Sequence, residues 1–164
     1  MYKRQIIIRD ETEADYAAID RVNDLAFKET AQNQIIRELR KTGDVLWSQV
    51  LLKNGDIIGH LMFYKVWLNG DLITAGLGPL SILPQYQRQG YGGDLIHSGL
   101  KKCDPMQHQI IFLLGHTEYY PRFGFSSELG AQYKSPWPRP AFMGLKLNPD
   151  APTSGTLTFP QAYL

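Results

Sequence analysis

The most constraining feature of the chain is a glycine-rich segment between an expected strand and an expected helix. Three glycines fall within the run Gln87-Arg88-Gln89-Gly90-Tyr91-Gly92-Gly93. The first turn of a helix leaves backbone N–H groups unpaired, and the helix macrodipole adds positive potential there. Glycines remove the Cβ atoms that would keep a ligand away from those groups. The segment therefore predicts an anion site suited to phosphate, with Arg88 as a further cationic contact. A glycine-rich turn that packs tightly and binds no ligand is the alternative.

The spacing of these glycines differs from two common phosphate-binding motifs. The dinucleotide pattern Gly-x-Gly-x-x-Gly is absent from the segment, and no Gly-Lys-Ser or Gly-Lys-Thr follows it. The segment is therefore neither of these motifs.

The periodicity of the flanking residues predicts a mixed α/β domain spanning residues 1–164. Strands are expected at Ile6–Arg9, Trp47–Lys53, Ile57–Leu68, Leu72–Leu83, Ile110–Leu114 and Ala141–Leu147. Helices are expected from the Thr12 N-cap to Phe27, at Asn33–Arg40 and Gly90–Lys102, and as a short piece at Tyr119–Phe123. The dipeptides Asn54-Gly55 and Asn69-Gly70 are typical of hairpin turns, so the centre is expected to be an antiparallel meander. A strand, a helix and a buried strand in succession then predict a parallel crossover.

The end of the chain is rich in proline. Pro136, Pro138 and Pro140 make Tyr133–Pro140 an expected extended loop, because proline fixes φ and donates no hydrogen bond. The stretch from residue 148 to 164 is expected to be an extended tail packed on the domain.

Composition narrows the function class. Seventeen basic and sixteen acidic residues give a net charge of +1, which argues against a dedicated nucleic-acid partner. The single cysteine, Cys103, excludes a disulfide framework within the chain. Neither a signal peptide nor a membrane span is expected from the apolar runs, so the protein is expected to be cytoplasmic with no membrane partner. The four histidines show no close ligand spacing, and no metal is assigned.

Two motifs resemble those of the GNAT superfamily of N-acetyltransferases. Gln87-x-x-Gly90-x-Gly92 matches its signature Gln/Arg-x-x-Gly-x-Gly/Ala, and Tyr120-Pro121-Arg122-Phe123-Gly124-Phe125 resembles its Tyr-x-x-x-Gly-Phe element. Most of the chain looks like a bacterial subgroup of small predicted N-acetyltransferases. The resemblance implies a central, mostly antiparallel sheet with a splayed parallel strand pair and helices on both faces.

The resemblance also implies acetyl-CoA as the cofactor. Its pyrophosphate would be held by the segment from Gln87 to Gly93, and its pantetheine arm by backbone groups of Leu80, Ser81 and Ile82. The strand that carries them contains Gly76, Gly78 and Pro79, residues typical of a bulge. An ordinary kink is the alternative. Relatives often place an asparagine upstream of the tyrosine, and none stands between Leu113 and Tyr120.

The expected reaction is direct transfer of an acetyl group to a primary amine. By resemblance, Tyr120 is the general acid that protonates the departing thiolate; an aromatic side chain that packs against the cofactor is the alternative. The base is less defined, because relatives often carry a glutamate on the strand Leu72–Leu83 and this one has no carboxylate. Candidate bases elsewhere are His116, Glu118, His60 and Glu29, of which the alternation around His60 favours a hydrogen-bonded structural role.

The acceptor is expected to be a small-molecule or peptide amine, and the resemblance allows a homodimer. Trp137 and Arg139 are candidates for acceptor selection, because the region they occupy often borders the acceptor in relatives. Cys103 is interpreted as inert, because the local pattern offers it no histidine partner. A non-catalytic module that senses acyl-CoA is the alternative function.

Overall fold

The computed structural model describes residues 5–164, and its chain divides into two compact units. Unit 1 comprises the chain up to Phe63 together with Pro79–Lys102, and unit 2 comprises Tyr64–Gly78 together with Cys103–Leu164. Two strands, β3 (Asp56–Leu68) and β4 (Asp71–Ile82), contribute residues to both units. The single domain over residues 1–164 stays a prediction.

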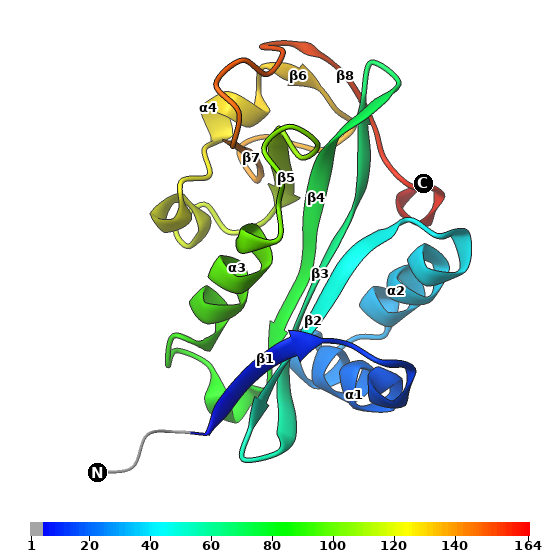
Figure 1. The fold of residues 1–164 in the computed structure, drawn as a ribbon, viewed down its shortest axis with the longest axis vertical. Coiled ribbons are helices and arrows are strands. Elements are labelled where there is room, and N and C mark those ends of the chain that lie inside the picture. Colours follow the sequence, from blue (N-terminus) through cyan, green and yellow to red (C-terminus); the bar gives the residue numbers. More distant parts are fainter. Residues whose placement is uncertain (1–4) are drawn as a thin grey trace. The chain divides into compact units, whose positions relative to one another are not determined.

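Unit 1 contains the first part of the sheet and three helices (Figure 1). Its elements, apart from its portions of β3 and β4, are β1 (Ile6–Asp10), η1 (Glu13–Asp15), α1 (Tyr16–Phe27), α2 (Ala31–Thr42), β2 (Val45–Lys53), η2 (Pro84–Tyr86) and α3 (Tyr91–Lys101). The expected start of the first helix is confirmed, since the Thr12 N–H donates to the Asp15 carboxylate over 2.7 Å. The expected stop of the second is also confirmed, because Gly43 adopts φ +76° at its C-cap.

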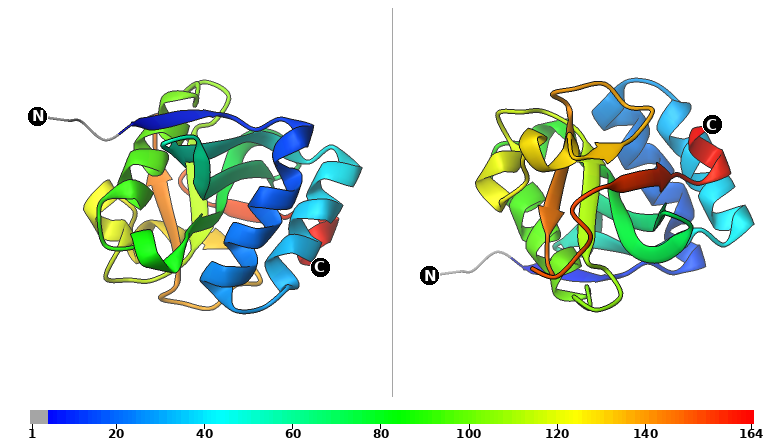
Figure 2. Two further views of the ribbon diagram at one scale, coloured as in Figure 1. Left: turned by 90° about the horizontal axis from the view of Figure 1, so that it is seen from below. Right: turned by 90° about the horizontal axis from the view of Figure 1, so that it is seen from above.

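Helices cover both faces of the sheet in unit 1. Asn23 of α1 lies beside His60, whereas a Cβ on Gly99 of α3 would stand 2.4 Å from a ring atom of Phe63. Residues 60 and 63 point to opposite faces of β3 because side chains alternate along a strand. Figure 2 shows α1 and α2 on one side of these strands and α3 on the other. The core of the unit is built from apolar side chains that include Ile19, Ile36, Leu51, Leu61, Leu95 and Ile96, each no more than 1% exposed.

Unit 2 contains the parallel pair of the sheet. Its elements, apart from its portions of β3 and β4, are β5 (Ile110–Leu114), η3 (Tyr120–Phe123), α4 (Ser127–Gly130), β6 (Tyr133–Lys134), β7 (Phe142–Lys146), β8 (Gly155–Thr158) and η4 (Gln161–Tyr163). Rings fill its core: Phe112 stacks on Phe142 with centroids 5.4 Å apart and meets Tyr133 edge to face at 5.2 Å. These contacts tie β5 to both β6 and β7.

The strand order is β1-β2-β3-β4-β5-β7, with β8 paired to β3 and to β6. β4 runs parallel to β5, whereas β1–β2, β3–β8 and β5–β7 are antiparallel. β6 and β8 form a second, two-residue parallel pairing. The expected mixed α/β fold with a mostly antiparallel sheet and a parallel pair is confirmed.

Three elements differ from the expectations. Helix α4 was not expected; it forms because the Ser126 side chain caps it by accepting from the Leu129 N–H over 3.1 Å. The expected loop Tyr133–Pro140 begins with β6. The expected tail contains β8 and η4, because Thr158 pairs with Trp67 of β3 and gives the segment a sheet partner.

Candidate functional site

The glycine-rich segment forms the turn that leads from η2 into helix α3 of unit 1. Gly90 is the N-cap with φ +88°, and Arg88 also adopts a left-handed conformation with φ +64°. The Asp94 N–H donates to the Gly90 carbonyl over 3.1 Å, which is the first helical bond. The preceding N–H groups therefore have no partner within the helix, and they belong to Tyr91, Gly92 and Gly93.

Side-chain hydrogen bonds hold this turn in place. The Gln87 amide donates to the carbonyl of Ile82, the last residue of β4, over 2.9 Å. Gln89 spans one turn by donating to the Gln85 carbonyl over 3.3 Å. Tyr91 is only 1% exposed and anchors the helix start in the core. The two glutamine side chains of the predicted cofactor set thus shape the turn.

The turn fits a diphosphate. Residues 87–90 are exposed, and a Cβ on Gly90 would meet nothing within 4 Å, so the space beside the N-cap is open. The first-turn N–H groups of Gly92 and Gly93, the positive end of an 11-residue helix and the Arg88 side chain all favour an anion there. The donor set is therefore the one that a phosphate group requires.

Strand β4 loses its parallel partner within unit 2. Its pairing with β5 runs from Thr74 to Gly76, and no further register is present towards its end. Gly78 follows with φ +146°, and Pro79 has no N–H to donate. β5 continues to Leu114 with β7 as its partner, so the expected opening of the parallel pair is present in unit 2.

The end of β4 lies in unit 1. Leu80 is half-buried, whereas Ser81 and Ile82 are buried. Within residues 5–164, the Ser81 hydroxyl has no hydrogen-bond partner although it is 3% exposed. This strand end carries the backbone groups that the resemblance assigns to the pantetheine arm.

Tyr120 begins the short helix η3 in unit 2. Its ring lies over Gly115, where a Cβ would stand 2.3 Å from a ring carbon, so only glycine allows this approach. Tyr119 and Phe125 contact the ring edge to face, with centroids 5.1 and 6.1 Å away. Burial, with a smaller effect of Tyr119, raises the Tyr120 pKa to about 12. The phenol is therefore protonated at neutral pH and is chemically able to donate a proton.

The candidate bases divide by exposure. His116 and Glu118 lie in the exposed turn before Tyr120, and Glu29 is exposed between α1 and α2. His60 is fully buried and hydrogen-bonded, as the alternation of its strand indicated. The structure thus gives His116 and Glu118 free access to solvent and places His60 inside unit 1.

The remaining candidates are Cys103, Trp137 and Arg139, all outside the glycine turn. Burial raises the pKa of the Cys103 thiol to about 12, so thiolate is scarce at neutral pH, in keeping with an inert cysteine. Trp137 packs edge to face on Phe159 and Tyr163, with centroids 5.5 and 6.1 Å away, and Arg139 is exposed. No cluster of three metal-ligating side chains occurs in the part of the chain that the structure describes.

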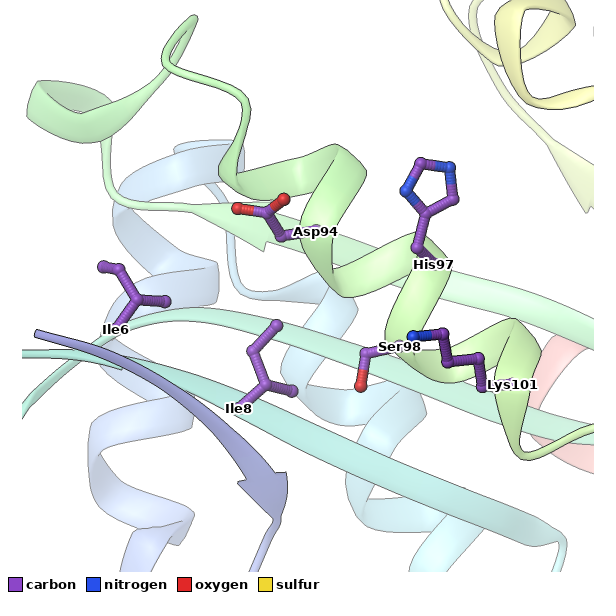
Figure 3. Close-up of a pocket in the computed structure, with 6 residues that line it drawn as sticks. All are labelled: Ile6, Ile8, Asp94, His97, Ser98 and Lys101. Carbon is purple, nitrogen blue, oxygen red and sulfur yellow. The ribbon is translucent and has the colours of Figure 1, made fainter. Parts of the chain in front are cut away.

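A shallow groove of about 390 Å³ lies between β1 and α3 in unit 1 (Figure 3). Ile6 and Ile8 form its apolar side, and the helix contributes Asp94, His97, Ser98 and Lys101. It contains none of the predicted cofactor or catalytic residues. The residues from 5 to 164 form no helix of the length and apolarity needed to cross a membrane.

The fold and the glycine turn together define a GNAT-like α/β protein. The family described as "Acetyltransferase (GNAT) domain" matches residues 7–127. The chain belongs to this acetyltransferase family, which confirms the resemblance and the enzyme class predicted from the motifs.

Two Escherichia coli K12 proteins named as uncharacterized N-acetyltransferases are similar in sequence. YhbS is 29% identical over 150 residues, which cover 89% of this chain and 90% of YhbS. YjhQ is 38% identical over 90 residues, which cover 52% of this chain and only 50% of YjhQ.

Two solved structures are similar over nearly the whole chain. A GNAT family acetyltransferase from Brucella melitensis, in complex with acetyl-CoA, has a TM-score of 0.83 and 30% identity, covering 99% of this chain and 100% of its own. Escherichia coli YhbS in complex with CoA has a TM-score of 0.91 and 24% identity, covering 99% of this chain and 94% of its own. The expectation of acetyl-CoA as the cofactor agrees with both complexes.

Proposed function

We propose that this protein is an acetyl-CoA-dependent N-acetyltransferase that moves the acetyl group from the CoA thioester to a primary amine by direct attack. Acyl transfer from acetyl-CoA is the general activity of the family to which the chain belongs. The observation that carries the proposal is the exposed glycine turn at the start of α3, which directs first-turn N–H groups and the positive end of the helix towards open space.

In the proposed complex, the diphosphate of acetyl-CoA binds at this turn. The N–H groups of Tyr91, Gly92 and Gly93 donate to it, and the Gly90 N-cap keeps the approach open. Arg88 adds charge, while Gln87 and Gln89 hold the turn in shape through their bonds to backbone carbonyls. The pantetheine arm bonds the backbone of Leu80, Ser81 and Ile82.

Transfer begins when the neutral amine attacks the thioester carbon. Negative charge grows on the carbonyl oxygen, and one backbone N–H at the end of β4 stabilises it. A single preorganised donor of this kind lowers a barrier by about 2.7–4 kcal/mol. As the C–S bond breaks, Tyr120 donates its phenolic proton to the sulfur, since its raised pKa keeps the phenol protonated.

The acceptor is proposed to be a small-molecule or peptide amine in the cytoplasm, and not a nucleic acid. Trp137 and Arg139 are the proposed selectivity residues, because Trp137 is half-buried and Arg139 is exposed in a loop of unit 2. His116 and Glu118, exposed before Tyr120, are the simplest candidates for the base that takes the proton of the amine. A homodimer is compatible with this proposal.

Release of free thiol from acetyl-CoA, measured across a panel of primary amines, tests the proposal. The expected result is amine-dependent thiol release with at least one member, together with a rise in melting temperature on addition of CoA. The β4 strand has no carboxylate between Leu72 and Ile82, which favours a non-catalytic acyl-CoA sensor as the second candidate. CoA binding without thiol release for any amine would support the sensor and contradict the enzyme.

A further inference from the structure

Strand β1 is an edge of the sheet in unit 1, with β2 on one side and, among residues 5–164, no strand on the other. Ile6 lies opposite Lys53, and one residue earlier the Asn54 N–H donates to the Gln5 carbonyl over 3.0 Å. Hydrogen-bonded and non-hydrogen-bonded pairs alternate along an antiparallel ladder. The backbone N–H and C=O groups of Ile6 and Ile8 therefore point away from β2, towards the open side of the edge.

Three consecutive isoleucines make this edge apolar. Ile7 is 55% exposed on one face of β1, and Ile6 and Ile8 are half-buried on the other. Edge strands of natural proteins usually carry a lysine, a proline or a bulge that discourages pairing with another chain. The segment from residue 6 to 8 has neither lysine nor proline, and its register with β2 is regular. The edge is therefore open to a further strand.

The groove between β1 and α3 borders this edge and has a charge at each end (Figure 3). The helix and the strand run in the same direction, because Lys102 at the end of α3 binds Asp10 at the end of β1 over 3.0 Å. Asp94, in the first turn of α3, therefore lies towards the Ile6 end of the groove, and Lys101 lies towards the opposite end. Both of these helix side chains are exposed.

The backbone and the isoleucines of this edge are complementary to a second copy of themselves. A two-fold axis brings β1 and the β1 of a second copy together antiparallel. When Ile6 pairs with the partner's Ile8, the outward backbone groups of both residues are bonded, and Ile7 lies opposite the partner's Ile7. A shift of two residues would instead set Ile6 against the partner's Asp10 and Ile7 against the partner's Arg9. The first register is therefore the one that joins apolar residues.

The charges of the groove agree with the same register. The two-fold axis also reverses α3, so Asp94 of one protomer comes to the end of the groove where the partner's Lys101 lies. Because α3 packs against β2, the two helices flank the joined strands about three strand spacings, ~14 Å, apart. A helix with its side chains is about 10–12 Å across, so side chains of the two helices meet above the joined strands. Opposite charges then face each other twice, which favours a second copy over an unrelated peptide.

We propose that two copies of this protein associate through β1. The strand pairs antiparallel with β1 of the second copy, with Ile6 against the partner's Ile8 and Asp94 against the partner's Lys101. The isoleucines of the two protomers together fill the apolar side of the groove. This association is independent of the proposed function, since it uses no residue of the proposed cofactor or catalytic set.

The mass in solution of wild type and Ile7→Lys tests the association, measured by sedimentation equilibrium at about 1–500 µM chain. Wild type is expected to approach twice 18.6 kDa at the highest concentrations. Ile7 is exposed in the single chain, so lysine is tolerated there, but it sets two like charges opposite each other across the axis. The dissociation constant is expected to rise about 30-fold or more. The matched control is Leu72→Lys, at an exposed apolar position of β4, which is expected to associate as wild type does.

An exchange of charges tests the register. Asp94→Lys and Lys101→Asp are each expected to weaken association about 10-fold, because each variant places like charges together twice. The double variant, Asp94→Lys with Lys101→Asp, is expected to return to within about 3-fold of wild type. Such a rescue requires that the two side chains face each other across the axis.

Amide hydrogen exchange of wild type at high and low concentration gives the same comparison without a substitution. The N–H groups of Ile6 and Ile8 are expected to exchange slowly only at the high concentration, whereas those of Ile7 and Arg9, which face β2, are expected to be protected at both. The mass of a single chain at every concentration would overturn the proposal, and so would association that survives Ile7→Lys. A double charge variant no tighter than the single ones, or exchange at Ile6 and Ile8 that ignores concentration, would overturn this register.

Discussion

The ion pair between Glu11 and Arg40 allows a quantitative prediction for Glu11→Gln. The Arg40 guanidinium donates to both carboxylate oxygens, over 2.9 and 3.2 Å, and the Arg40 and Glu11 side chains are only 14% and 13% exposed. Glutamine has nearly the same shape as glutamate, but it removes the charge and replaces one accepting oxygen with a donating amide nitrogen. The substitution therefore tests the ion pair and its hydrogen bonds without creating a cavity.

The expected loss follows from the carboxyl pKa. Burial raises the pKa of Glu11, but the neighbouring His60 imidazole and hydrogen bonds from Arg40 and Ser48 outweigh it and lower the value from 4.5 to about 2. At 1.36 kcal/mol per pH unit, this shift corresponds to ~3 kcal/mol at neutral pH. Water reaches part of the carboxylate and screens it, so we expect a loss of about 2 kcal/mol. For a chain of this size the melting temperature falls by about 4–8 °C.

The pH dependence gives the prediction a sign. The folded pKa of Glu11 is below the unfolded one, so its stabilisation is complete above about pH 4.5 and is lost as the pH falls towards 2. Urea unfolding at pH 7 measures the full contribution, and at pH 3 it measures a contribution that is partly lost. The difference between wild type and Glu11→Gln is expected to shrink by about half or more at pH 3.

A matched control is Glu13→Gln, two residues away and exposed. Its melting temperature is expected to equal that of the wild type at both pH values. Equal stability of Glu11→Gln and wild type at pH 7 would refute the reasoning. A difference that is the same at pH 3 and pH 7 would also refute it, because the effect would then not depend on the charge.

Three further substitutions test the site and its support. Gly76→Ala would place a Cβ 2.1 Å from the Tyr64 ring, so we expect a loss of about 1–3 kcal/mol by urea unfolding; unchanged stability would contradict this close packing. Gly90→Ala puts a side chain on a residue with φ +88°, which costs about 1–2 kcal/mol and distorts the turn. The affinity for CoA, measured by calorimetry, is therefore expected to fall, and an unchanged affinity would argue that the turn does not bind CoA. Tyr120→Phe is expected to lower kcat about 100-fold and to leave the affinity for CoA nearly unchanged. An unaffected rate of thiol release would rule out Tyr120 as the general acid.

Local signals made most of the fold predictable. The Asn54-Gly55 and Asn69-Gly70 turns defined the central meander, and both asparagines adopt φ +51° as such turns require. The strand Ile110–Leu114, whose first four residues are buried, was recognised by its unbroken apolar character. The glycine segment was placed at a helix start because its three glycines lie between an expected strand and an expected helix, and Gly90 is the N-cap of α3 with φ +88°.

The elements that were not predicted depend on partners far away in the sequence. Strand β8 forms because Leu157 and Thr158 meet the end of β3, about ninety positions earlier, and no local pattern reports such pairing. Helix α4 has four residues, too few for a helical period to be visible. Both β8 and α4 therefore depend on contacts that a local sequence pattern does not report.

The buried hydrogen-bonded network of Glu11, Ser48 and His60 could be predicted from the sequence only in part. Alternation along β3 indicated that His60 is structural, but its partners Glu11 and Ser48 come from a turn and from another strand. A carboxylate, a serine and a histidine at such spacings have no sequence signature. The predicted role of Gln87 was also incomplete. The motif assigned Gln87 to the cofactor, whereas its side-chain amide donates a hydrogen bond to the Ile82 carbonyl.

Calorimetric titration with CoA and with pantetheine, which has the thiol arm but no diphosphate, tests the central claim most directly. If amide hydrogens at the start of α3 hold the diphosphate, CoA binds at one site per chain with measurable heat and pantetheine binds far more weakly or not at all. A flat trace with CoA, or equal affinity for the two ligands, would contradict the account.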